Sequence, residues 1–225
     1  TLDERFIKDF TFLHFLGVDQ QYYIILNDHK FDWITPLNFP TKIDVSKHIK
    51  QHNELYVIVK DNLDFRFPLG KQSKKPKGIF YTPFSGIYYP VFIERVNEGN
   101  IEKIKFTTTM ESVSLDITST AKEFHVSIYD NNNLILSENI TYKNPTFKIP
   151  NPKCWEPNNP HLYDIKISTR TDEITSYFGL REIKIKDGLI YLNNKKIFLN
   201  GVLDQGYYPE GIITPVSYDS LKFDI

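Results

Sequence analysis

Short segments in which apolar and polar residues alternate constrain this chain more than any other feature. Alternation with a period of two is typical of strands that are buried on one face. Seven such segments follow one another at a spacing of about ten residues, and clusters of Asn, Pro and Asp separate them. They are residues 101–109, 113–117, 123–130, 134–140, 146–149, 161–169 and 174–178. Short strands in this number and at this spacing predict an immunoglobulin-like β-sandwich.

Further elements are predicted on both sides of this series. Residues 10–16, 22–27, 54–60 and 88–96 predict a first β region. Residues 189–192 and 196–199 predict a small hairpin, and Ser217 is a candidate N-cap for a helix that runs to Ile225. Within the sandwich, Asn131-Asn-Asn133 predicts a hairpin turn because Asn tolerates positive φ. Turn residues near 96–100 and a change of pattern near 181–186 mark two boundaries.

The composition excludes several classes of protein. Lys and Arg number 27 against 28 Asp and Glu, and the net charge of −1 argues against a dedicated nucleic-acid or membrane-surface binder. No apolar run reaches the roughly 18 residues of a membrane-spanning helix. The single Cys154 excludes a disulfide framework and a multi-thiolate zinc site. His48 and His52 lack a signposted third ligand, so they favour a solvated loop, as does the lysine-rich run 71–77. We therefore expect no metal and no cofactor.

The first residues have neither an initiator Met nor the layout of a signal peptide. We expect the chain to be processed or cut from a longer one, with the cytoplasm slightly favoured as its location.

Aromatic residues are abundant, with 17 Phe and 14 Tyr, and many lie in residues 70–94. Such rings at the rim of a sandwich either stack on a sugar ring or fill an interface between domains, and we favour the interface. The proline-rich run 151–160 predicts an extended loop that Trp155 anchors in the sandwich.

Four blocks of the sequence, given below in chain order, resemble glycoside hydrolase family 2, and most of all its bacterial β-galactosidase-type members. Leu13-His-Phe-Leu-Gly-Val-Asp19 and the later Asn53-Glu-Leu55 resemble late strands of the family's sugar-binding jelly roll. Residues 70–94 resemble its Gly-Lys-Gln loop and the aromatic segment that follows. Trp155-Glu-Pro-Asn-Asn-Pro-His-Leu-Tyr163 resembles a signature of its immunoglobulin-like domain. Residues 178–202 resemble its passage into the catalytic barrel.

The resemblance implies an all-β chain in three parts. Residues 1–96 would form part of a galactose-binding-like jelly roll, 97–183 an immunoglobulin-like β-sandwich, and 184–225 a short stub of a (β/α)8 barrel. The family uses two barrel glutamates, and such a barrel needs about 250 residues. Only about forty residues follow Arg181, so we expect no catalytic residue in this chain and no activity from it alone.

The implied function is that of a non-catalytic portion of an enzyme that hydrolyses O-glycosidic bonds of β-galactoside type, with a carbohydrate partner. The resemblance is compatible with a homo-oligomer and does not decide the oligomeric state. The alternatives are a freestanding carbohydrate-binding sandwich and a structural or adhesive one. The barrel-entry segment favours the enzyme portion, because neither alternative needs it.

Asp204 is the candidate substrate contact of the complete enzyme. It follows an apolar strand, and in a barrel the carboxyl ends of the strands form the active-site face. Its carboxylate can accept two sugar hydroxyls, while Gln205, Tyr207 and Tyr208 add an amide and stacking rings. Asp204 capping a turn is an equal alternative. Leu203-Asp-Gln205 departs from the Asn-Arg-His that is common in the family. The sequence therefore does not predict which sugar is bound.

A second set of residues is predicted to be structural and to lie between domains. Trp155 and Tyr163 supply large apolar faces. Gly179 permits a close approach that a Cβ would block, and Arg181 offers a fork of donors to the next domain.

Overall fold

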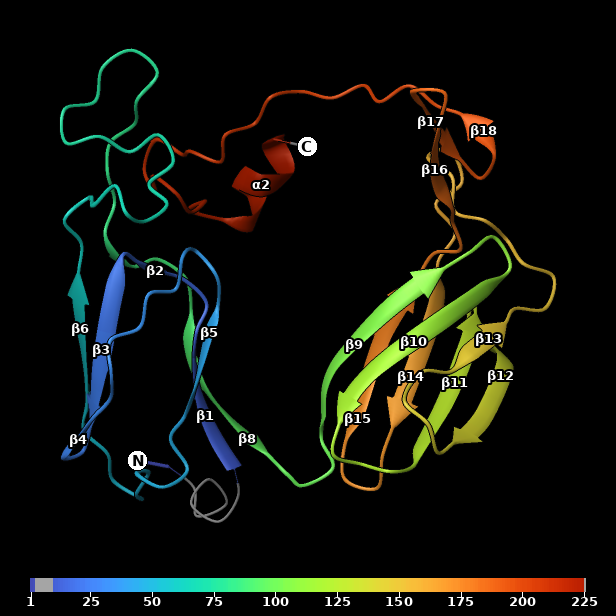
Figure 1. Cartoon of the computed structure of the whole chain (residues 1–225), viewed down its shortest axis with the longest axis horizontal. Helices are drawn as coiled ribbons and strands as arrows, with labels where there is room; N and C mark the ends of the chain where they lie inside the picture. The colour runs from blue at the N-terminus through green and yellow to red at the C-terminus, as the bar shows by residue number, and fades with distance from the viewer. Residues whose placement is uncertain (3–9, 225) are drawn as a thin grey trace. The chain divides into compact units, whose positions relative to one another are not determined.

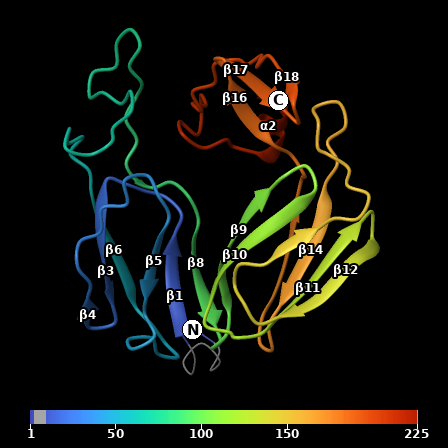
Figure 2. The ribbon, with the colours of Figure 1, turned by 45° about the vertical axis from the view of Figure 1, so that its right-hand side comes forward.

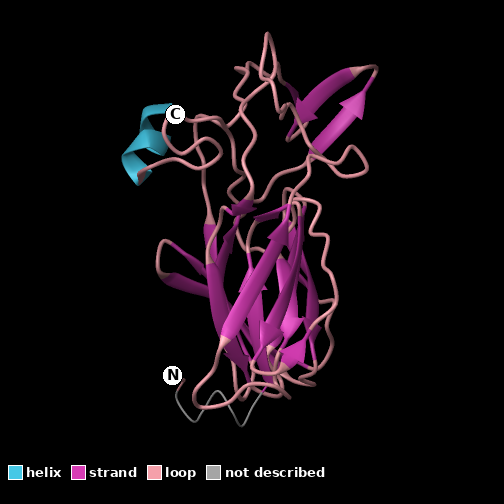
Figure 3. Cartoon of the chain, turned by 90° about the vertical axis from the view of Figure 1, so that its left-hand side faces the viewer, coloured by secondary structure: helices cyan, strands magenta, loops and turns pink. Residues whose placement is uncertain are grey.

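Strands make up nearly all of the regular structure (Figure 1, Figure 3). The computed structural model describes residues 1–2 and 10–224. They divide into two compact units, one of residues 1–2, 10–96 and 203–224 and the other of residues 97–202. No helix among the described residues is long and apolar enough to cross a membrane. The prediction of an all-β chain is confirmed.

The first unit contains two three-stranded antiparallel sheets. One has the order β5–β1–β8, with β1 at Phe10–Phe15, β5 at Thr41–Asp44 and β8 at Val91–Val96. The other has the order β4–β3–β6, with β3 at Gln21–Leu26, β4 at His29–Lys30 and β6 at Leu55–Lys60. The short strands β2 (Val18–Asp19) and β7 (Gly86–Ile87) pair with each other.

Alternation along the strands builds the core of this unit. On β1, Leu13 and Phe15 are buried, and on β3 the buried side chains are those of Tyr22, Ile24 and Leu26. These residues belong to one apolar cluster that draws on both sheets. Strand β8 begins three residues later than predicted, after Pro90, which has no N–H for a ladder.

The second unit contains a sandwich of seven strands, from β9 to β15 (Figure 1, Figure 2). One sheet has the order β13–β10–β9, with β9 at Ile101–Thr108, β10 at Ser112–Ser119 and β13 at Thr146–Lys148. The other has the order β12–β11–β14–β15, with β11 at Phe124–Asp130, β12 at Asn133–Ile140, β14 at Tyr163–Ser168 and β15 at Glu173–Phe178. All seven predicted strands are present, so the prediction of a β-sandwich is confirmed.

Inward-facing residues from both sheets fill the sandwich. Val113 is fully buried on β10. Val126 and Ile128 on β11 lie opposite Ile167 and Ile165 on β14, and all four are buried. Opposed apolar pairs of this kind stabilise a sheet and specify its register.

Short elements at the ends of the units complete the fold. Asn131 and Asn132 have φ of 47° and 67° in the turn between β11 and β12, as predicted. Strands β16 (Ile183–Lys186), β17 (Leu189–Leu192) and β18 (Lys195–Lys196) form a small sheet. Strand β16 was not predicted, and β18 is shorter than predicted.

The predicted helix near the C-terminus is present as α2 (Tyr218–Asp224). Ser217 Oγ accepts a hydrogen bond from Ser220 N at 3.1 Å, so Ser217 is the N-cap. The predicted last residue, Ile225, lies outside the described residues.

Candidate functional site

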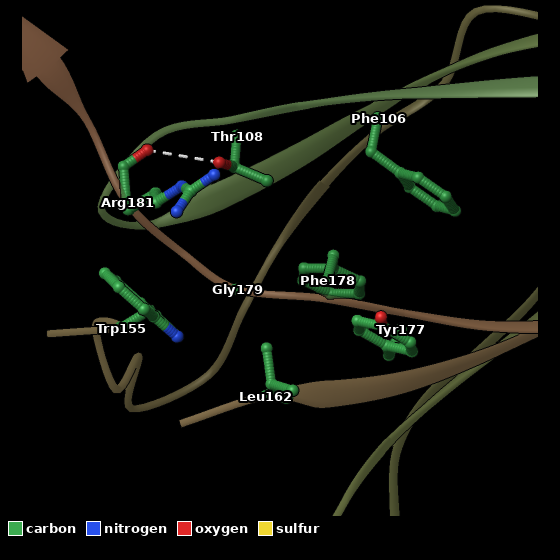
Figure 4. A pocket seen from close by; sticks show the side chains of 8 residues that line it. All are labelled: Phe106, Thr108, Trp155, Leu162, Tyr177, Phe178, Gly179 and Arg181. Atoms are coloured by element: carbon green, nitrogen blue, oxygen red, sulfur yellow. Dashed lines mark hydrogen bonds between the residues drawn. The ribbon is translucent and has the colours of Figure 1, made fainter. Parts of the chain in front are cut away.

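A pocket of about 410 Å³ opens at one end of the sandwich (Figure 4). Strands β9 and β15, the loop before β14 and the residues after β15 contribute its walls. The lining residues are Phe106, Thr108, Trp155, Leu162, Tyr177, Phe178, Gly179 and Arg181. The pocket therefore combines aromatic faces with one guanidinium group.

Backbone contacts hold Trp155 at the wall of this pocket. Its N–H donates to Leu180 O at 2.8 Å, and its carbonyl accepts from Asn193 Nδ2 at 3.0 Å. A Cβ on Gly179 would lie 3.0 Å from Trp155 Cβ and 3.3 Å from two ring carbons. Gly179 thus permits a close approach that a side chain would block. Trp155 itself is only half-buried, because its ring faces the pocket instead of the core.

Arg181 lines the pocket, whereas Tyr163 lies in the core of the sandwich. The Arg181 guanidinium carbon lies 5.2 Å from the centroid of the Trp155 ring, within the range of a cation–π contact. The Arg181 carbonyl accepts a hydrogen bond from Thr108 Oγ1 at 3.1 Å. Tyr163 is buried in the sandwich core, where its ring stacks on Phe178 and its hydroxyl accepts from Lys153 N at 2.8 Å. The predicted role of these residues between domains stays a prediction.

The other predicted site residues lie in the first unit, against the aromatic-rich loop 70–94. The rings of Tyr207 and Tyr81 are stacked, with centroids 3.9 Å apart and an interplanar angle of 11°. Lys71 Nζ donates to Gln205 Oε1 at 2.9 Å. Two segments that lie far apart along the chain therefore form one cluster.

Asp204 and Tyr208 make local contacts within the C-terminal segment. Asp204 Oδ1 accepts a hydrogen bond from Gly206 N at 2.8 Å, which is the geometry of an Asx turn. That contact uses one of the two carboxylate oxygens, and the Asp204 side chain is exposed. The backbone of Tyr208 pairs with that of Ile212. The turn contact exists, and it does not test whether Asp204 contacts a substrate.

A buried polar pair, Asp19 and Gln72, lies at the base of the same cluster. Gln72 Nε2 donates to Asp19 Oδ2 at 3.1 Å, while Gln72 Oε1 accepts from Phe84 N at 2.9 Å. Burial raises the pKa of the Asp19 carboxyl, and the hydrogen bond from Gln72 opposes that rise. Burial, followed by the nearby Tyr81 and Asp19, raises the pKa of the Tyr207 hydroxyl.

The sequence did not single out the buried pair of Asp19 and Gln72. Both stand in blocks that carry the family resemblance, Asp19 after Val18 and Gln72 after Gly70-Lys71. Their place in those blocks was the available signal, although only the folded chain brings the two side chains together. Among the described residues, no group of three or more His, Cys, Asp or Glu side chains is arranged to hold a metal ion.

Comparisons of the sequence and of the structure with known proteins all find glycosidases. Residues 94–181 match the family model of glycosyl hydrolases family 2. A β-galactosidase of Thermoanaerobacterium thermosulfurigenes is 27% identical over 92% of this chain and 32% of its own length. A β-galactosidase of Staphylococcus xylosus is 24% identical over 93% of this chain and 21% of its own length.

Solved structures show the same fold. A β-glucuronidase from Ruminococcus gnavus, in complex with a C6-substituted uronic isofagomine, superimposes with a TM-score of 0.81 at 19% identity. The superposition covers all of this chain and 42% of that one.

The fold and the comparisons define the class first: an all-β chain with a β-sandwich that is similar to one part of larger glycosidases. More specifically, residues 94–181 match the family model of glycosyl hydrolases family 2, and most of the chain is similar to one part of two β-galactosidases. The chain spans about a fifth to a third of the length of these two β-galactosidases.

Proposed function

We propose that this chain is a non-catalytic portion of an enzyme that hydrolyses O-glycosidic bonds in carbohydrates of β-galactoside type. The observation that carries the proposal is the match to two β-galactosidases over 93% and 92% of this chain. In this proposal, residues 1–96 belong to the sugar-binding jelly roll, 97–183 form the immunoglobulin-like sandwich and 184–225 begin the catalytic barrel. The two glutamates of a retaining glycosidase, about 5 Å apart, would belong to the barrel.

The substrate-facing segment in this proposal is residues 204–208. The Asp204 carboxylate accepts sugar hydroxyls, and the neighbouring Gln205 amide and Tyr207 and Tyr208 rings complete the contact surface. Two observations support this role. Tyr207 stacks on Tyr81, and Gln205 accepts a hydrogen bond from Lys71, so the segment has fixed partners in the aromatic-rich loop.

The end of the sandwich serves as a structural connection in this proposal. Trp155, Gly179 and Arg181 line an open pocket of aromatic rings, and Tyr163 supports it from the core. Leu162 and Tyr177, which also line the pocket, are 43% and 65% exposed. An exposed aromatic surface with a guanidinium fork suits contact with a neighbouring domain.

Activity measurements test the proposal directly. Purified 1–225 is expected to show no turnover of nitrophenyl β-galactoside or nitrophenyl β-glucuronide. A protein extended along the reading frame beyond Ile225 is expected to hydrolyse the β-galactoside and to lose that activity when a barrel glutamate is changed to Gln. Turnover by 1–225 that disappears on substitution of one of its own glutamates would overturn the proposal.

Two variants of Asp204 in the extended protein separate substrate contact from turn formation. Asp204→Asn keeps an oxygen that can accept from Gly206 N but removes the charge, whereas Asp204→Ala removes both. Substrate contact predicts that Asp204→Asn loses several-fold in kcat/KM at an unchanged melting temperature. A purely local turn role predicts intact kinetics for Asp204→Asn and a lower melting temperature for Asp204→Ala. Asp219→Asn, at an exposed position of α2, is the charge-matched control.

A further inference from the structure

The segment between Asp64 and Glu94 has the most one-sided charge of the chain. It contains no acidic residue, yet it carries Arg66, Lys71, Lys74, Lys75 and Lys77. Arg66 is neutralised locally, since its guanidinium pairs with the Asp64 carboxylate at 2.5 Å. The lysines therefore form a local positive region in a chain whose net charge is −1.

Contacts at its base hold this lysine loop, residues 71–81, in place. Tyr81 N donates to Lys71 O at 2.8 Å, and Ser73 N donates to Tyr81 O at 3.1 Å, which closes the loop. Beside this closure, the buried Gln72 side chain joins Asp19 to the backbone of Phe84. A fixed base limits the entropy that the loop would lose on binding a ligand.

The outer part of the lysine loop presents cationic and apolar groups together. Lys74, Lys75 and Lys77 are exposed, and none of them makes an ion pair with a described residue. Beside them, Ile79 is 70% exposed and Phe80 is 49% exposed. Ammonium groups bind anions, while an exposed aromatic face packs against the apolar face of a sugar ring.

We propose that the lysine loop binds an anionic carbohydrate, a glycan chain that carries carboxylate or sulfate groups. This inference rests on the proposed function and narrows its substrate class. The base of the loop contacts the 204–208 segment through Lys71 and Tyr81, so a chain bound by the lysines would continue toward the proposed substrate contacts. A single-stranded nucleic acid is the competing polyanion, and it is disfavoured because Phe80 is the one exposed aromatic ring of residues 71–81, whereas binding of successive bases uses several stacking rings.

Binding of purified 1–225 to polysaccharides of matched size tests the inference. Polygalacturonate provides carboxylates, dextran sulfate provides sulfates, and galactan is the neutral control. We expect affinity electrophoresis to show retardation by at least one anionic glycan and none by galactan. The retardation is expected to weaken as the salt concentration rises to about 0.15 M, where screening acts over roughly 8 Å.

Two triple variants with the same change of charge identify the residues responsible. Lys74→Gln/Lys75→Gln/Lys77→Gln is expected to lower the affinity about tenfold, the effect of removing three exposed charge contacts. The control, Lys103→Gln/Lys105→Gln/Lys186→Gln, removes three exposed lysines of the second unit and is expected to bind within about twofold of the parent.

Several results would overturn the inference: no binding to either anionic glycan, an equal loss in the two triple variants, or displacement by a single-stranded RNA homopolymer at equal charge concentration. Any of these would leave the turnover assays of the extended protein unaffected. Conversely, glycan binding by the lysine loop in a protein without glycosidase activity would refute only the proposed function.

Discussion

Replacing Gly179 with Ala tests how tightly the end of the sandwich is packed. The new Cβ would lie 3.0 Å from Trp155 Cβ and 3.3 Å from ring atoms Cγ and Cδ1. Optimal carbon–carbon contacts are about 3.5–4.0 Å long, so Trp155 has to move. Its two backbone hydrogen bonds, to Leu180 and Asn193, resist that movement.

The expected net cost combines two terms. Overpacking of this kind costs about 1–3 kcal/mol. Replacing Gly with Ala at a compatible φ also restricts the unfolded chain, which offsets about 0.4–1 kcal/mol. We therefore expect Gly179→Ala to lower the free energy of unfolding of the second unit by up to about 2.6 kcal/mol.

Gly201→Ala is the matched control in the same unit. A Cβ at Gly201 meets no atom within 4 Å, so only the unfolded-chain term applies. This variant is expected to unfold at the same or a slightly higher urea concentration than the parent, by up to about 1 kcal/mol in stability.

Tryptophan fluorescence during urea unfolding measures both variants. The chain has two Trp residues, so a Trp33→Phe background makes Trp155 the sole reporter. The reasoning is refuted if Gly179→Ala has the same urea midpoint as Gly201→Ala or a higher one.

Three further predictions each concern residues inside a single unit: two in the second unit and one in the first. Asn132 has φ of 67°, so Asn132→Ala should lose about 1–2 kcal/mol in urea unfolding while Asn132→Gly should not; equal midpoints would contradict this. The hydrogen bond from Lys153 lowers the pKa of the Asp130 carboxyl. This contact therefore stabilises the folded protein above the unfolded-state pKa of about 3.9, and the stabilisation is lost as the pH falls through the folded-state pKa. Asp130→Asn should therefore be less stable than the parent at pH 6, with the difference vanishing in acid; a difference independent of pH would refute it. Gln72→Ala leaves Asp19 without its amide donor and should cost about 1–3 kcal/mol in thermal unfolding, against no measurable change for the exposed control Gln51→Ala.

Most of the strands were predictable from the sequence because their signals are local. Alternation on β10, with Val113, Leu115 and Ile117 all buried, is visible in five consecutive residues. The turn at Asn131-Asn132 follows from the tolerance of Asn for positive φ. Strand β16 was not predicted because both faces of Ile183–Lys186 are exposed. A strand without a buried face need not show a recognisable alternation of apolar and polar residues.

The residues of the candidate site were predictable in part. Gly179 and Trp155 were expected to be in structural positions, and the close approach between them explains the glycine. The exposure of Trp155 to a pocket was not predictable, because an aromatic residue between prolines has the same sequence signal whether its ring points inward or outward.

The sequence by itself determined the strands, the turns and the family resemblance, since each depends on residues that are neighbours along the chain. Only the tertiary structure decided which loops meet. Lys71 and Gln205 are 134 residues apart in sequence and share a hydrogen bond, and Gln72 reaches Asp19 across 53 residues. Such contacts depend on how sheets and loops pack in three dimensions, and no periodicity along the chain encodes them.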